Sequence, residues 1–213
     1  MRIAVLGAGA IGAYVGACLE RGGAEVTLIA RGPHLEALRA RGVRVLSPLG
    51  DFSAHPAATD RLDAVAQAEV VFVALKAYSL PALAEHLGAA LDPGAAAIWA
   101  QNGVPWWYFS AHRGPLEGTV LQSVDPGGVI ARSIRPGQSI GCVVYCATEL
   151  VEPGVVRHIE GTRFAIGEPD GSPSPRCRAI AEAFASGGLK APPSTDLREQ
   201  IWLKLLGNVA FNP

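Results

Sequence analysis

Apolar runs and a glycine-rich break alternate along the first thirty residues. Arg2–Leu6 is a short aliphatic run that predicts a strand, and glycines follow at positions 7, 9 and 12. Apolar residues then recur at helical spacing up to Gly22-Gly23, after which Glu25–Ala30 predicts a second strand. A strand, a glycine turn, a helix and a strand in this order predict a βαβ unit.

The same rhythm continues in the middle of the chain. Val70–Leu75 and Ala95–Ala100 predict two more strands, and residues 80–91 between them predict a helix. Strands that alternate with helices predict a doubly wound parallel sheet. Both strands end in polar residues, Lys76 in the first and Gln101-Asn102-Gly103 in the second. Open α/β sheets bind their ligands outside the carboxyl ends of such strands.

The pattern changes after residue 118. Strand-like runs alternate there with Pro/Gly turns and predict antiparallel additions to the sheet. These runs are Thr119–Val124, Ile140–Ala147, Val155–Ile159 and Arg163–Ile166. Residues 178–185 predict a helix, and Pro192-Pro193 is a rigid break. We therefore predict a Rossmann-type α/β domain over residues 1–193 and a separate element over residues 194–213.

This last element predicts a helix of unusual composition. Asp196 followed by Glu199 resembles a capping box at its start. Apolar residues then surround the helix almost completely, which predicts burial rather than an amphipathic surface helix. Lys204, Asn208 and Asn212 recur at four-residue steps and so form one narrow polar stripe.

The polar stripe has two interpretations. Burying an ammonium or a bare amide is costly, so the stripe either hydrogen-bonds neighbouring backbone or is directed at a polar small molecule. The second interpretation fits hydride transfer to a carbonyl, which builds negative charge on oxygen and needs a nearby proton donor. Lys204 in a partly desolvated cleft would supply that proton, and Asn208 and Asn212 would hold the substrate.

Composition narrows the function classes. The chain has 213 residues, 49% of them hydrophobic and 17% charged, which favours a buried core over disorder. A formal net charge of −1 argues against a surface for nucleic acid or anionic lipid. Apolar runs are too short for a membrane span, and the early glycines argue against a signal peptide, so we expect a cytoplasmic protein.

The cysteines and histidines show no metal-ligand spacing, so no metal is expected. Cys18, Cys142, Cys146 and Cys177 are expected to be small buried side chains in a reducing compartment. The five histidines are scattered singly and are expected to be structural or exposed.

The glycine motif GAGAIG, residues 7–12, carries the first functional hypothesis. Between a strand and a helix, Gly7 would make a tight turn, Gly9 would admit a pyrophosphate, and Gly12 would allow close helix packing. The phosphates would lie on the motif, including Ala8, Ala10 and Ile11, at the helix N-terminus. The alternative is a glycine-rich turn of an unrelated α/β fold.

Three further residues bear on which dinucleotide would bind. No acid follows the second predicted strand; Arg31 stands there, and a guanidinium favours the 2′-phosphate of NADP, although it is also a plausible surface charge. Lys76 is either a cofactor contact or a surface lysine. Asn102 precedes Gly103 in a typical turn pair and is also placed to bond the cofactor's ribose or amide.

With these motifs in view, the chain resembles the ketopantoate reductase family (2-dehydropantoate 2-reductase). The motifs that carry the resemblance are GAGAIG at 7–12 with Arg31, LKAY at 75–78, QNGVPWW at 101–107 and LREQIWLKLLGNVAFNP at 197–213. The resemblance implies NADPH-dependent reduction of 2-dehydropantoate to (R)-pantoate, a step towards pantothenate. It implies Lys204 as proton donor, Asn208 and Asn212 as substrate contacts, Lys76 and Asn102 as NADP contacts, and a position near Ala147 beside the cofactor.

Members of that family continue into an all-helical domain, so the resemblance makes residues 194–213 the first helix of a truncated second domain. We expect this helix to expose apolar surface around Trp202, Leu206 and Val209, and to favour homo-oligomers. We also expect the chain to bind NADPH but to be weakly active. Alternatives are a reductase of another branched 2-oxo acid and a non-catalytic NADP-binding sensor.

Overall fold

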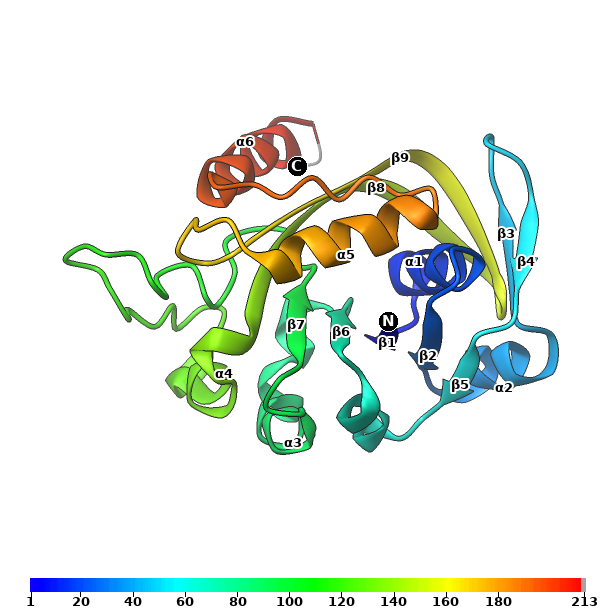
Figure 1. Cartoon of the computed structure of the whole chain (residues 1–213), viewed down its shortest axis with the longest axis horizontal. Coiled ribbons are helices and arrows are strands. Elements are labelled where there is room, and N and C mark those ends of the chain that lie inside the picture. The colour runs from blue at the N-terminus through cyan, green and yellow to red at the C-terminus, as the bar shows by residue number, and fades with distance from the viewer. Residues whose placement is uncertain (212–213) are drawn as a thin grey trace.

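The computed structural model describes residues 1–211, so Asn212 lies outside the described residues. Within them, nine strands form one sheet in the order β4-β3-β9-β8-β7-β6-β1-β2-β5 (Figure 1). The strands are β1 (Arg2–Leu6), β2 (Glu25–Ile29), β3 (Val43–Leu46), β4 (Phe52–Ala54), β5 (Ala57–Thr59), β6 (Val70–Val73), β7 (Ala96–Trp99), β8 (Ser139–Glu152) and β9 (Val155–Gly167).

Six α-helices and five short 3-10 helices accompany the sheet in residues 1–211. The α-helices are α1 (Ala10–Arg21), α2 (Gly32–Arg41), α3 (Ala84–Ala90), α4 (Val129–Ser133), α5 (Pro175–Ser186) and α6 (Leu197–Phe211). The 3-10 helices are η1 (Leu62–Gln67), η2 (Ala77–Ser79), η3 (Pro81–Leu83), η4 (Pro126–Gly128) and η5 (Pro136–Gln138). None of the helices in this part of the chain combines the length and the apolarity that crossing a membrane requires.

The centre of the sheet is parallel, as the sequence pattern predicted. β1 pairs in parallel with β2 on one side and with β6 on the other, and β7 pairs in parallel with β6. All four residues of β6 and of β7 are buried, which explains their continuous apolar runs. Figure 1 shows α1 and α5 over one face of the sheet and α3 and α4 over the other. The Rossmann-type α/β prediction is confirmed.

A long hairpin extends the sheet on the β7 side. β8 pairs in parallel with β7 and antiparallel with β9, and the two strands turn at Gly154, whose φ is +84°. The antiparallel addition is therefore confirmed, but the runs Val155–Ile159 and Arg163–Ile166 belong to one strand. β3 then pairs in parallel with β9, and β4 pairs antiparallel with β3. The sequence pattern did not predict β3, β4, β5 or α2.

The strand predicted at Thr119–Val124 is wrong. This segment lies in a stretch of turns and irregular backbone between β7 and α4. Its hydrogen bonds are local, since the backbone N–H groups of Val124 and Asp125 both donate to Leu121 O. The physical reason is that β8 occupies the free edge of β7, so this strand-like run has no strand to pair with.

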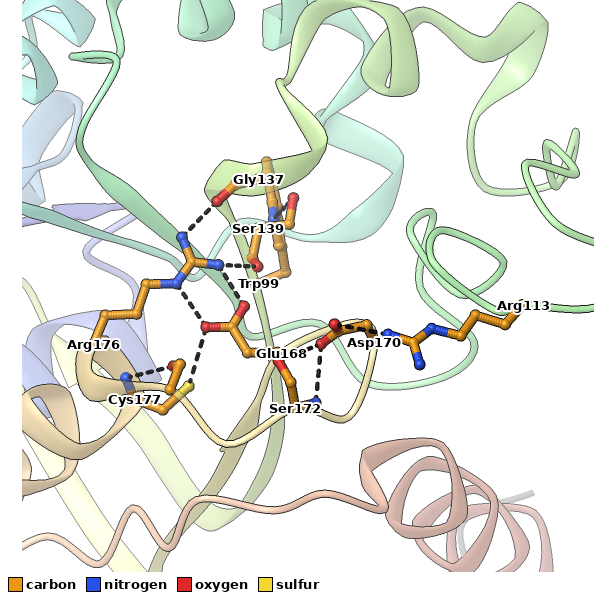
Figure 2. Close-up of polar contacts among 10 residues, drawn as sticks. Trp99, Arg113, Gly137, Ser139, Glu168, Asp170, Ser172, Arg176 and Cys177 are labelled. Carbon is orange, nitrogen blue, oxygen red and sulfur yellow. Dashed lines mark hydrogen bonds and ion pairs between the residues drawn. The ribbon is translucent and has the colours of Figure 1, made fainter.

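An ion pair fixes α5 to the sheet. Glu168, directly after β9, is 8% exposed, and its carboxylate accepts from both Nε and Nη2 of Arg176 in the first turn of α5. The Arg176 guanidinium also donates to the carbonyl oxygens of Gly137 and Ser139, as Figure 2 shows. This bidentate arrangement joins α5, β8 and the end of β9.

The segment before α6 is bonded to the sheet. The Ile166 N–H donates to Pro192 O, and the Ser194 N–H donates to Ile166 O. The two prolines therefore lie along β9, and the domain division at residue 193 stays a prediction.

Helix α6 is held at its first turns. Leu197 and Ile201 are buried, and the Arg198 guanidinium donates to Tyr108 O and Ser110 O. The burial expected all round this helix is absent, because nothing in residues 1–211 covers the face that carries Leu206 and Val209. The exposed surface expected there is confirmed, with Trp202 50%, Leu206 64% and Val209 68% exposed.

Candidate functional site

A cavity of about 880 Å³ opens at the carboxyl edge of the parallel strands. Its walls come from the ends of β1, β2, β6 and β7, from the residues after β5, and from part of β8. The strand order reverses direction at β1, and ligands of open α/β sheets bind at such a point. The volume also lies within the range of about 300–1,000 Å³ that is usual for small-molecule sites.

The glycine motif forms the floor of this cavity. Gly7 has a φ of +96°, and the backbone N–H groups of Gly7 and Ala8 donate to Ile29 O, which ties the loop to β2. Gly9 lies on the cavity wall, and a Cβ built on it would meet no protein atom within 4 Å. The loop therefore leaves space above Gly9 into which a ligand group can approach the backbone.

Gly12 lies where helix α1 packs against the glycine loop. A Cβ on Gly12 would lie 2.2 Å from Gly7 O and 3.0 Å from Val5 Cγ1, so α1 crosses the loop at the closest distance that glycine allows. Gly12 is not among the residues that line the cavity, whereas Ala10 and Ile11 in the first turn of α1 are. Their position brings the positive end of the α1 dipole to the cavity.

Arg31 lines the cavity at the end of β2, as predicted. It is exposed, occupies the N-cap position of α2, and makes no ion pair with any residue of 1–211. Asp60 lines the same region because β5 pairs with β2 and brings Thr59 opposite Ile29. Its Oδ1 lies 3.5 Å from Nη2 of Arg39. Asp60 could not be predicted from the residues that follow β2, because it reaches this edge only through the pairing of β5 with β2.

His34 also lines the cavity, three residues after Arg31. The ring is half-buried, and its Nδ1 accepts from the Gly154 N–H at 3.1 Å, so the proton of the neutral ring lies on Nε2. Nε2 is buried, and its contact with the Ala8 backbone is not a hydrogen bond of ordinary geometry. Burial lowers the pKa of His34, and the Ala8 backbone opposes that effect. Nothing in the local sequence distinguishes His34 from the other four histidines, because only the fold brings it to the cavity.

At the opposite wall, Lys76 and Asn102 both line the cavity, as predicted, and both are exposed. Gln101 between the strand β7 and Asn102 is more tightly held. Its Nε2 donates to Val73 O at 2.8 Å and to Leu75 O at 3.1 Å, so its Oε1 is left as an acceptor. That Oε1 is buried and has no partner in residues 1–211.

Alternate residues of β8 complete the wall, namely Val144, Cys146, Thr148 and Leu150. Ala147, the position that the family resemblance indicated, is not among the lining residues, although its neighbours on both sides are. This follows from the alternation of side chains along a strand. Burial raises the pKa of the Cys146 thiol to about 12, so it stays protonated at neutral pH. All four cysteines are free, and three of them are buried.

Lys204 and Asn208 lie apart from the cavity lining. Both are half-buried on α6, and Lys204 Nζ lies 5.3 Å from the ring centroid of Tyr145 on β8. The Tyr145 hydroxyl donates to Gln200 Oε1 at 3.2 Å, which fixes the tyrosine to α6. The third predicted member of the stripe, Asn212, lies outside the described residues. Lys204 therefore lies beside β8, at a residue that alternates with the lining positions Val144 and Cys146.

Comparisons with known proteins place the chain among relatives. Residues 3–171 match the family model described as ketopantoate reductase PanE/ApbA. A 2-dehydropantoate 2-reductase of Mesorhizobium japonicum is 44% identical over the whole chain, which covers 66% of that relative. One of Halobacterium salinarum is 32% identical, with 64% of it covered. A solved structure from Ralstonia solanacearum MolK2 is 41% identical, with a TM-score of 0.92 over the whole chain and 66% of that protein.

The chain thus spans slightly less than two thirds of the length of these relatives. The matched region contains the glycine loop, Arg31, Lys76 and Asn102. The family model and the identity over the full chain together show that this chain belongs to the ketopantoate reductase family.

Proposed function

We propose that this chain binds NADPH in the cavity and contributes to the reduction of 2-dehydropantoate to (R)-pantoate. The observation that carries the proposal is the convergence of the glycine loop, Arg31, Lys76 and Asn102 on one cavity of about 880 Å³. Membership of the ketopantoate reductase family supplies the substrate class.

The residues fit a dinucleotide. The open space above Gly9 admits a pyrophosphate at the α1 N-terminus, while a side chain there would fill it. The lining also carries the polar and cationic side chains of Arg31, Lys76 and Asn102, which can bond to the phosphates and sugars of such a ligand.

We infer a preference for NADP over NAD from Arg31. Its guanidinium is exposed at the cavity, without an ion pair in the described chain, and has the geometry to bind a phosphate through two N–H groups. Asp60 is the acid at the same edge, and it already lies beside Arg39. The unpaired cation therefore favours the cofactor that carries a 2′-phosphate.

Bound NADPH supplies the hydride for the C2 carbonyl of the substrate. In this proposal the Lys204 ammonium donates a proton to the carbonyl oxygen as charge develops there, and Asn208 and Asn212 hold the substrate. The resemblance of the Lys204 helix to the family supports this role; in residues 1–211 Lys204 lies beside Tyr145, whose side chain alternates with those of the lining residues Val144 and Cys146.

The test is a titration of the chain with NADPH and NADH by nicotinamide fluorescence, followed by addition of 2-dehydropantoate. We expect NADPH to bind more tightly than NADH. Lys204→Ala should leave NADPH binding unchanged and abolish whatever substrate-dependent oxidation the chain supports. Lys190→Ala, at an exposed lysine outside the cavity lining, is the control and should change neither. Absence of NADPH binding to the wild-type chain would remove the basis of the proposal.

A further inference from the structure

An acid lies at the end of the cavity where the 2′-phosphate is proposed to bind. Asp60 directly follows β5, and Arg31 lies just after β2. These two strands are parallel neighbours with Thr59 opposite Ile29, so both side chains line the cavity at the carboxyl ends of adjacent strands. Because adjacent strands lie only about 4.8 Å apart, the charge of Asp60 acts on any group that Arg31 binds.

A free carboxylate at this place works against the binding of a 2′-phosphate. It repels the phosphate, and it is also a natural ion-pair partner for the Arg31 guanidinium. In dinucleotide-binding folds, an acid beside the adenosine ribose accepts a hydrogen bond from its 2′-OH and so favours NAD. If it were left free, Asp60 would therefore favour NADH over NADPH.

Arg39 on α2 holds this acid. Helix α2 packs beside β5, as Figure 1 shows, and Arg39 reaches across to the strand. Its Nη2 lies 3.5 Å from Asp60 Oδ1, and its Nε donates to Ala58 O at 3.3 Å. Its Nη1 lies 3.8 Å from Glu36 Oε1 on the same helix. The guanidinium is thereby fixed between α2 and β5, while Arg39 itself lies outside the cavity lining.

The ion pairs of the described chain agree with this division of roles. In residues 1–211, Asp60 pairs with Arg39 and no pair involves Arg31, although Arg31 and Asp60 line the same cavity. The side chains of Arg39 and Asp60 are 45% and 61% exposed, so the pair itself contributes little to stability. Its consequence is for a ligand, because a phosphate that reaches Arg31 meets a paired acid instead of a free one.

We propose that Arg39 is a specificity-determining residue of this cavity, which acts through Asp60. By pairing with the carboxylate, it leaves the Arg31 guanidinium free for the 2′-phosphate of NADPH. It also withholds from NADH an acceptor for the ribose 2′-OH. The inference rests on the proposed function, because it needs a dinucleotide in the cavity. The competing account is a surface ion pair that only joins α2 to β5.

Four variants and one control separate these accounts. Arg39→Met removes the cation and keeps an aliphatic stem, whereas Arg39→Lys keeps a positive charge beside the acid. Asp60→Asn removes the acid, and the double variant Arg39→Met/Asp60→Asn removes both charges. Arg41→Met is the control, because Arg41 is an exposed arginine of the same helix, outside the cavity lining, that donates to the Pro153 carbonyl oxygen instead of to an acid.

The experiment is a fluorescence titration of each protein with NADPH and with NADH, together with thermal unfolding of the free proteins. For Arg39→Met we expect the ratio of the NADH Kd to the NADPH Kd to fall about three- to tenfold, the effect of one unpaired exposed charge a few ångströms from a phosphate. Arg39→Lys and Arg41→Met should keep a ratio close to that of the wild-type chain. All variants should unfold at nearly the wild-type temperature, because the pair is exposed.

The double variant shows whether Arg39 acts through the acid. We expect Asp60→Asn and the double variant to have the same ratio, no lower than that of the wild-type chain, because no acid is then left to hold. An unchanged ratio in Arg39→Met would overturn the proposal in favour of a surface ion pair. A low ratio that persists in the double variant would also overturn it, since Arg39 would then act on the phosphate directly. Lack of NADPH binding by the wild-type chain is a different result, which rejects the proposed function itself.

Discussion

The glycine loop makes a sharp prediction, because two of its glycines lie in opposite environments. Gly9 has φ −73° and ψ −159°, which an L-residue adopts without strain, and a Cβ there meets no protein atom within 4 Å. We therefore expect Gly9→Ala to change the free energy of unfolding by no more than about 1 kcal/mol, the cost of alanine at a helix N-cap. The added methyl group occupies the space proposed for the pyrophosphate, so the Kd for NADPH should rise at least tenfold, or about 1.4 kcal/mol.

Gly12→Ala should have the reverse profile. Its Cβ would lie 2.2 Å from Gly7 O, a backbone atom that cannot move without shifting the loop. Overpacking of this kind costs about 1–3 kcal/mol, and a backbone obstacle favours the upper end. For a chain of this size that range corresponds to a fall in Tm of about 2–12 °C, with the larger values expected here.

The assay combines thermal unfolding, followed by circular dichroism, with NADPH titration of each variant. We expect Gly9→Ala to bind NADPH more weakly at a nearly wild-type Tm, and Gly12→Ala to unfold at a lower Tm. Equal destabilisation by both substitutions would contradict the open space above Gly9, because it would mean that the added methyl group meets protein atoms there. A Gly9→Ala variant with normal NADPH affinity would show that no phosphate group approaches this loop.

Three further predictions concern other parts of the molecule. Arg176→Met leaves the carboxylate of Glu168 buried and unpaired, so chemical denaturation should show a free energy of unfolding lower by about 2–3 kcal/mol. This loss lies below the full range for buried pairs because the guanidinium is 35% exposed. Arg178→Met, at an exposed neighbour, is the control and should have little effect. Arg31→Ala should weaken NADPH binding and leave NADH binding nearly unchanged in fluorescence titrations, since it removes the cation proposed for the 2′-phosphate; equal losses for both nucleotides would contradict that assignment. Burial raises the pKa of Cys146 from about 9 to about 12, so its thiol ionises in the unfolded chain first, and stability should fall as pH rises above 9. Denaturant midpoints between pH 7 and 10 check this, and Cys146→Ser should make the fall shallower.

Much of the architecture followed from local patterns in the sequence. The spacing of apolar residues and glycines in the first thirty positions predicted the βαβ unit, because both the helical period and the glycine turn are properties of adjacent residues. The continuous apolar runs of β6 and β7 likewise indicated buried parallel strands. The placement of Arg31, Lys76 and Asn102 at one cavity followed from the rule that parallel strands end at a common edge.

Other features depended on which segments pair over long distances. The run Thr119–Val124 has the composition of a strand, but β8 occupies the only position beside β7 that it could have used. The burial expected for α6 also did not follow from its apolar composition, since burial needs a neighbouring surface and only its first turns have one.

The candidate site likewise combines features that local sequence indicates with features that only long-range pairing decides. Its glycine loop is encoded within six consecutive residues, so the sequence alone indicates both its shape and its ligand class. His34, Asp60 and Cys146 reach the cavity through contacts made by the hairpin tip, β5 and β8, and nothing in their local sequence marks them. Local sequence determines backbone conformation because neighbouring residues share the same dihedral and hydrogen-bond constraints. Only the tertiary structure decides which side chains share a cavity, because that depends on strand order and register across the whole chain.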